Sequence, residues 1–240
     1  MLLPDMTSEQ MKKVFAEDQR EVEHFANRFM TTDGLRALRS HATTFPCTLT
    51  RFFDSTVSHQ HYLLCWRISQ RCEAYGVAKR YYVRAVLHTD YGTEMANQML
   101  DPDTEQLHIV YFRAHLLRRY AERMGLDLHG DELARYFTKR NPMLIEATEW
   151  RKDNDVMMLC HDGACFGEID PEDQMRINLK TFIATDTMND DTYRSHLNST
   201  FNDAVMNALV NIYSSDQELA RFLAKTTKPR KTIKHTENKE

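Results

Sequence analysis

Glycine and proline are scarce in this sequence. It contains seven glycines and six prolines among 240 residues, and tight turns depend on these two residue types. Residues that favour helices, among them Met, Leu, Ala, Arg and Glu, are plentiful. The composition therefore disfavours a turn-rich β protein and predicts an all-α fold.

Cysteine pairs and long apolar runs are also lacking. The five cysteines form no Cys-x-x-Cys pair and are odd in number, which indicates a reduced, cytoplasmic protein. Polar residues interrupt the N-terminal segment before the core of a signal peptide could form, and no apolar run approaches the length of a membrane span. The formal net charge of -4 is mild and mixed in sign, so we expect neither nucleic acid nor a membrane as partner.

The body and the end of the chain differ in composition. Apolar residues make up 42% of the sequence, which is enough for one sizeable core without a division into several domains. The last sixteen residues, "KTTKPRKTIKHTENKE", contain six Lys or Arg and two Glu. We expect a helical bundle domain over residues 1–224 and a basic, disordered tail over residues 225–240.

Apolar spacing along the chain predicts a single compact bundle of about seven helices. Thr7 or Ser8 resembles a helix N-cap, and this first helix should end near "TTDG". Further helices are predicted over about 61–99, 107–125 and 190–214, and another beginning near Pro142. One or two short helices are expected between Val156 and Phe182.

Several polar residues recur at helical spacing. The sets are Asp90, Glu94 and Asn97; His108 and His115; and His196, Thr200 and Asp203. Carboxylates and imidazoles that face the interior of a helical bundle bind iron or manganese. Amphipathic helices rich in His and acidic residues also produce such sets by chance, as solvated or capping side chains. No Gly-rich phosphate loop and no Gly-x-Ser-x-Gly motif is present.

Three motifs, "RISQRCEAYGVAKRYYVRAVLHTDYG", "YAERMGLD" and "YRSHLNSTFND", occur in an order that resembles the heme-oxygenase-like superfamily. This group includes TenA-type thiaminases, PqqC-type quinone synthases and nonheme diiron oxidases. The resemblance implies that Asp90 and His196 are metal ligands, that Tyr193 matches the family's aromatic position, and that Glu168 supplies a carboxylate from a middle helix.

The sequence also departs from the family pattern. Thr200 and Asp203 stand where the family has an Asp and a second His, and Asn97 stands where another His would fall. A further ligand position falls on Arg113, between His108 and His115. The implied metal site is therefore either rearranged or lost.

The resemblance implies a nonheme iron or diiron oxidase or oxygenase that acts with O2 on a small amino-acid-like or fatty-acid-like substrate, in a homodimer. Tyr193 and Arg113 would orient the substrate as catalytic residues. One or two iron ions would be bound by Asp90, Glu168, His196, Asp203, His108 and His115. Two alternatives stay open: a metal-free TenA/PqqC-like enzyme with acid and base residues in a closed pocket, and a noncatalytic helical interaction protein.

The cysteine pattern makes a direct prediction. In a reduced protein Cys47, Cys65, Cys72, Cys160 and Cys165 are all thiols. Thiol titration of the denatured, nonreduced chain should therefore find five reactive groups. Two or fewer would contradict the assignment to a reducing compartment.

Overall fold

The computed structural model describes residues 1–40, 47–68, 81–100, 106–142, 144–146 and 153–187. The chain divides into two units, Met1–Asn189 and Asp190–Glu240, and every described residue belongs to the first. The expected tail over residues 225–240 and the helix expected over 190–214 lie outside the described residues.

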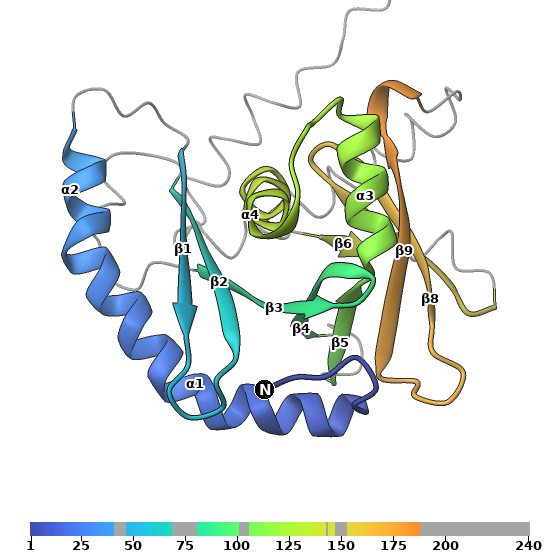
Figure 1. Ribbon diagram of the computed structural model, residues 1–240, viewed down its shortest axis with the longest axis horizontal. Coiled ribbons are helices and arrows are strands. Elements are labelled where there is room, and N and C mark those ends of the chain that lie inside the picture. The colour runs from blue at the N-terminus through green and yellow to red at the C-terminus, as the bar shows by residue number, and fades with distance from the viewer. Residues whose placement is uncertain (41–46, 69–80, 101–105, 143, 147–152, 188–240) are drawn as a thin grey trace, which may run out of the picture. The chain divides into compact units, whose positions relative to one another are not determined.

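The described part of the chain contains four α-helices and nine β-strands, so the prediction of an all-α, seven-helix bundle is wrong (Figure 1). The helices are α1 (Ser8–Thr31), α2 (Asp33–Arg39), α3 (Ala114–Arg123) and α4 (Gly130–Arg140). The strands are β1 (Cys47–Asp54), β2 (His61–Ile68), β3 (Tyr81–Thr89), β4 (Gly92–Leu100), β5 (Leu107–Phe112), β6 (Ile145–Glu146), β7 (Asp155–Cys160), β8 (Gly163–Ile169) and β9 (Arg176–Ala184). The resemblance to the helical heme-oxygenase-like superfamily, and the oxidase function inferred from it, are overturned with the fold.

All nine strands belong to one mixed sheet. Its strand order is β1-β2-β3-β4-β5-β9-β8-β7-β6. Neighbouring strands are antiparallel except β5 and β9, which run parallel. The sheet therefore consists of two antiparallel meanders, β1 to β5 and β6 to β9, that meet at one parallel pair.

Alternate residues of the strands support two separate cores. On β2, Tyr62 and Leu64 belong to the cluster formed with α1 and α2. The intervening Leu63 belongs to a second cluster, formed with α3, α4 and the strands β7 to β9. Because successive side chains of a strand point to opposite faces, α1 and α2 cover one face of the sheet, and α3 and α4 cover the other.

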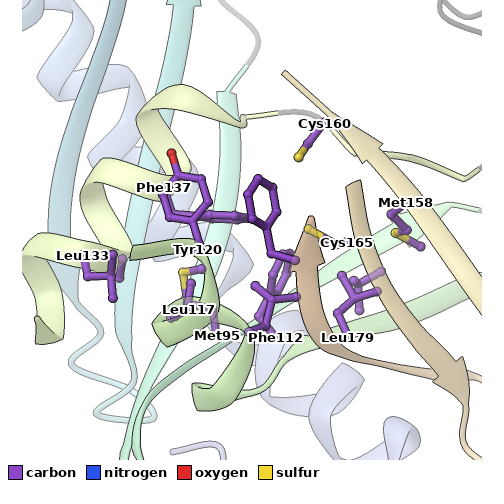
Figure 2. Close-up of a cluster of buried hydrophobic side chains, with 14 of the residues drawn as sticks. Met95, Phe112, Leu117, Tyr120, Leu133, Phe137, Met158, Cys160, Cys165 and Leu179 are labelled. Carbon is purple, nitrogen blue, oxygen red and sulfur yellow. The ribbon is translucent and has the colours of Figure 1, made fainter. Parts of the chain in front are cut away.

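The core under α3 and α4 is rich in aromatic rings and sulfur-containing side chains (Figure 2). The ring of Tyr120 meets those of Phe137 and Phe182 edge to face, with centroids 4.8 and 4.9 Å apart. Such edge-to-face contacts stabilise a core beyond the burial of their area. They join both helices to strand β9.

Burial on both faces explains why strands were mistaken for helices. Strand β2, "HYLLCWRI", is buried at six of its eight positions, so its apolar residues form a continuous run instead of alternating. Such a run fits a buried helix and a buried strand equally well. The prediction of short helices between Val156 and Phe182 is wrong for the same reason. This segment forms β7, β8 and most of β9. The helix expected near Pro142 is replaced there by the short strand β6.

The first helix was predicted correctly. Thr7 caps α1 through a capping box with Gln10, whose backbone N–H donates to the Thr7 hydroxyl. Its buried residues include Met11, Val14 and Val22. Successive members of this set are three and eight residues apart, which places them on one side of a helix. Here the polar face is exposed, so the periodicity has a single interpretation.

The segment around Asp90 is a hairpin turn and not part of a helix. Thr89 pairs with Gly92, which leaves Asp90 and Tyr91 as the connection between β3 and β4. Gly92 has a φ of 120°, a backbone conformation that favours glycine. Gly92, which falls within the helix predicted over about 61–99, is therefore required by the turn.

Two expectations from composition agree with the structure. Cys47, Cys65, Cys160 and Cys165 are free thiols, while Cys72 lies outside the described residues. Among the helices in the described ranges, none has both the length and the apolar character to cross a bilayer.

The aromatic core gives a stability prediction. Phe137 is fully buried, so Phe137→Ala should lower the free energy of unfolding by about 3–5 kcal/mol through lost contacts and a cavity. The matched control is Leu107→Ala, since Leu107 is 41% exposed and a change there should stay within about 0.5 kcal/mol. Urea unfolding followed by circular dichroism measures both, and equal effects would contradict this description of the core.

Candidate ligand-binding site

The hairpin of β3 and β4 is paired along only part of its length. Five residue pairs, from Ala85↔Ala96 to Thr89↔Gly92, join the two strands. Beyond them, residues 81–84 of β3 pair with β2, and residues 97–100 of β4 pair with β5. The two strands thus separate and leave a gap in the sheet, which we call the β3–β4 opening.

A cavity of about 380 Å³ occupies the β3–β4 opening. Residues 81–84 and 97–99 form its walls, together with Phe15, Val110, Pro142 and Leu144. The described lining combines apolar carbons, tyrosine rings, two amides and one guanidinium. A volume of this size with a few polar groups is typical of sites for small ligands.

The opening is closed at the end where the β3–β4 pairing stops, at the pair Ala85↔Ala96. Arg84 directly precedes Ala85 at this closed end and is 2% exposed. Its Nη1 donates to the Thr138 hydroxyl at 2.9 Å, and its Nη2 donates to the Asn141 carbonyl at 2.7 Å. The guanidinium carbon lies 4.9 Å from the ring centroid of Phe112 and 5.4 Å from that of Phe137. Arg84 is therefore held at the C-terminal end of α4, where the helix dipole is negative.

The charge of Arg84 is only partly balanced. Its partners in the described part of the chain are a hydroxyl and two carbonyls, with no carboxylate among them. Burial lowers the pKa of Arg84 to about 10, because removal from water disfavours the charged form, although nearby thiols oppose this. The guanidinium stays charged at neutral pH, and contacts with the described residues use at most three of its five N–H donors.

Asn97 stands across the opening from Arg84. The register that pairs Ala85 with Ala96 would pair these two residues next if the hairpin continued. The Asn97 Nδ2 donates to the Gln98 carbonyl at 3.1 Å, while its Oδ1 is buried and has no hydrogen-bond partner within the described residues. Leaving a buried acceptor unpaired costs about 1–3 kcal/mol, so a ligand that donates a hydrogen bond here gains that energy.

Asp162, in the turn between β7 and β8, fixes the end of α4 that holds Arg84. Its carboxylate accepts hydrogen bonds from the Tyr120 hydroxyl at 2.6 Å and from the Arg140 Nη2 at 2.5 Å. Its backbone N–H donates to the Asn141 Oδ1 at 3.0 Å. Asn141 is thereby held in place, and its carbonyl is oriented toward Arg84.

Two imidazoles lie near the Asp131 carboxylate in the first turn of α4. The Asp131 carboxylate lies 3.5 Å from the His61 Nε2 and 3.3 Å from the His88 Nε2. The other ring nitrogen of His61 contacts Asp54. The Asp162 contacts at the C-terminal end of α4 fix the acceptors around Arg84.

The expected metal ligands within the described ranges occupy different elements of this sheet-rich fold. Asp90 is exposed in the β3–β4 turn, His115 is exposed on α3, and Glu168 on β8 pairs with Lys180 at 2.5 Å. His108 on β5 pairs with Met99 of β4. At a rise of about 3.3 Å per residue, Met99 lies roughly 23 Å along β4 from Gly92 at the turn. Asp90 and His108 therefore lie near opposite ends of β4.

The expected iron site is not found in the described part of the chain, where no three His, Cys, Asp or Glu side chains are placed to hold a metal ion. Arg113, expected to orient a substrate, instead precedes α3 as its N-cap residue, and its guanidinium carbon lies 4.8 Å from the Tyr111 ring centroid. Tyr193, His196 and Asp203 lie outside the described residues.

Comparisons with protein-family models, with curated proteins and with solved structures gave no match. The assignment of a function therefore depends on the geometry of the opening.

Sequence reasoning missed both polar residues of the site. Arg84 interrupts the apolar run "YYVRAVLH", and a charged residue within such a run is rarely buried without a partner. That interruption was the available signal. Asn97 was noted for its helical spacing from Asp90 and as the position where the resemblance implies a histidine. Strand β4 places it on the opposite face of the sheet from Glu94.

The Asp162 contacts predict a pH dependence. Burial alone would raise the pKa of Asp162, but hydrogen bonds from Arg140 and Tyr120 outweigh it and lower that pKa below its ordinary value of 3.8. A lowered pKa contributes stability above the unfolded-state pKa, and this contribution disappears as the pH falls through the folded-state pKa.

The stability lost by Asp162→Asn should therefore be largest near pH 6 and shrink between about pH 4 and pH 2. Urea unfolding at a series of pH values measures this difference. Glu122→Gln is the control, because Glu122 pairs with Arg119 on an exposed helix surface. A difference that does not change with pH would contradict the role of the Asp162 carboxylate.

Proposed function

We propose that this protein is a binding module whose β3–β4 opening takes a ligand with a carboxylate next to a hydrogen-bond donor. The observation that carries the proposal is the buried charge of Arg84 on the wall of an open cavity, without a carboxylate partner in the described part of the chain. The overturned oxidase function has no part in this proposal.

The guanidinium favours an anion. A carboxylate accepts a charge-assisted hydrogen bond from an N–H group that Thr138, Asn141 and Pro142 leave free, and this bond is strengthened because Arg84 is only 2% exposed. The existing contacts with Thr138 and Asn141 hold the group in position before a ligand arrives. Such preorganisation reduces the entropy lost on binding.

Asn97 supplies the second recognition element. Its Oδ1, which has no partner among the described residues, accepts a hydrogen bond, so the preferred ligand has an N–H or O–H group close to its carboxylate. Acylated amino acids have this arrangement. The apolar part of the lining, which includes Met99, Val110 and Leu144, accommodates a small aliphatic side chain. With its free thiols, the module is expected to act in a reducing compartment such as the cytoplasm.

Binding of N-acetyl-L-alanine and of its neutral amide tests the proposal. Loss of the carboxylate should weaken binding by at least about tenfold, because a buried guanidinium loses a charged partner. Isothermal titration calorimetry at millimolar ligand or ligand-observed NMR measures this difference. Equal binding of the acid and the amide, or binding of neither, would contradict the proposal.

The decisive variant is Asn97→Asp, which changes little in shape but places a carboxylate across from Arg84. It should weaken binding of N-acetyl-L-alanine by at least about tenfold by repelling its charge, and it should raise the melting temperature near pH 7 by balancing Arg84. The control is Arg135→Met, because Arg135 also lies over an aromatic ring, that of Phe52, but is not among the residues that line the cavity. Unchanged binding by Asn97→Asp would show that the anion binds elsewhere.

A further inference from the structure

We infer that the ligand of the β3–β4 opening is the C-terminal end of an extended peptide, which pairs with β4 as an added strand. This inference rests on the proposed function, since the same Arg84 and Asn97 recognise the ligand. It adds the class of partner and the way in which its main chain is bound.

The edge of β4 that faces the opening lacks a strand partner among the described residues. Residues Asn97–Leu100 pair with β5 on their other edge, and the pairing with β3 ends at Ala96. The Gln98 carbonyl instead accepts a hydrogen bond from the Asn97 side chain. Backbone N–H and C=O groups require partners, and an extended peptide supplies them in the spacing of a strand.

The position of Arg84 sets the direction of the peptide. Because Arg84 lies at the closed end of the opening, a terminal carboxylate bound there makes the peptide run from the open end toward the closed end. That direction is opposite to β4, which runs from Asn97 at the closed end to Leu100 at the open end. The added strand is therefore antiparallel to β4, which is the more stable arrangement of a strand pair.

Two groups recognise the last residue of the peptide. Arg84 binds its carboxylate, and the Asn97 Oδ1 accepts a hydrogen bond from its backbone N–H. Both groups contact atoms that every chain end shares, so specificity for side chains comes from the apolar lining around Val110 and Leu144. Small aliphatic side chains near the C terminus fit this lining best.

The peptide N-acetyl-Thr-Val-Thr-Ala with a free carboxylate is the probe for this inference. It should bind the full-length chain at least about tenfold more tightly than N-acetyl-L-alanine, since it adds two or more main-chain hydrogen bonds to β4. The amide of the same peptide should bind at least about tenfold more weakly than the acid. The preference for the acid over the amide should be absent in Asn97→Asp and retained in Arg135→Met.

The source of the carboxylate is tested with a second peptide, N-acetyl-Thr-Val-Asp-Ala amide. It has a negative charge on a side chain but none at its end. If it binds as tightly as the free acid, the opening recognises acidic side chains and the inference of a chain end is wrong.

Backbone N-methylation tests the added strand itself. Successive N–H groups of a strand point to opposite sides, so methylation at the second and at the third residue from the C terminus should have unequal effects. One of the two peptides should lose about tenfold in affinity and the other little, because only one N–H faces β4. Equal effects would overturn strand addition.

Failure of the inference and failure of the proposed function give different results. If N-acetyl-L-alanine binds through Arg84 and Asn97 but the tetrapeptide gains no affinity, the ligand is a small molecule and only the peptide inference is wrong. If neither the acylated amino acid nor the peptide binds, both are wrong.

Discussion

The guanidinium of Arg84, buried without a carboxylate in the described part of the chain, is the constraint on which the arrangement of this domain depends. A charge placed inside an apolar core must be surrounded by oriented dipoles. The C-terminal carbonyls of α4 meet that need, so the helix must end over β3. The β7–β8 turn must then hold Asn141 through Asp162. The contacts of Arg84 and Asp162 thus link one strand to the end of a helix and to a distant hairpin.

The same constraint accounts for the unusual shape of the hairpin. A continuous β3–β4 ladder would bring Arg84 and Asn97 side by side on one face of the sheet, beneath the end of α4. Instead the strands separate at this point, and each keeps its outer neighbour. Among the described residues, the separation leaves the inner edge of β4 without a strand partner beyond Ala96 and the Asn97 Oδ1 without a hydrogen-bond partner. Structures tolerate such losses mainly where they serve function.

The sequence predicted the fold only where one face of an element is exposed. The helix α1 was recognised because its capping box and its polar face leave a single interpretation. Half of the segment from Leu107 to Gly125 was also assigned correctly, as α3, but its first six residues form β5. Strands β2 and β3 are covered on both faces, so their apolar runs have no period that distinguishes a strand from a helix.

The sequence signal for the candidate site was Arg84, a charged residue within the apolar run "YYVRAVLH". The opening itself could not be predicted, because the separation of two strands depends on contacts with α4 and the β7–β8 turn, which lie far away in the sequence. Asp90 and Gly92 fall within the helix that was predicted over about 61–99, where a glycine is unfavourable. In the structure both residues belong to a hairpin turn, which accommodates the glycine.

The parallel pair of the described sheet, β5 with β9, joins strands that lie far apart in the sequence. Folding of the sheet therefore involves both local and long-range pairing. Within each meander, consecutive strands are joined by antiparallel pairing, so most contacts form between segments close in the chain. The pair Ile109↔Arg176, by contrast, closes a loop that contains both α3 and α4. Because closing a long loop costs chain entropy before its contacts can form, the two meanders are suited to form first and to join last. The cavity in the first meander and the turn that fixes its arginine belong to different halves of this process, so the site is complete only when the two halves have met.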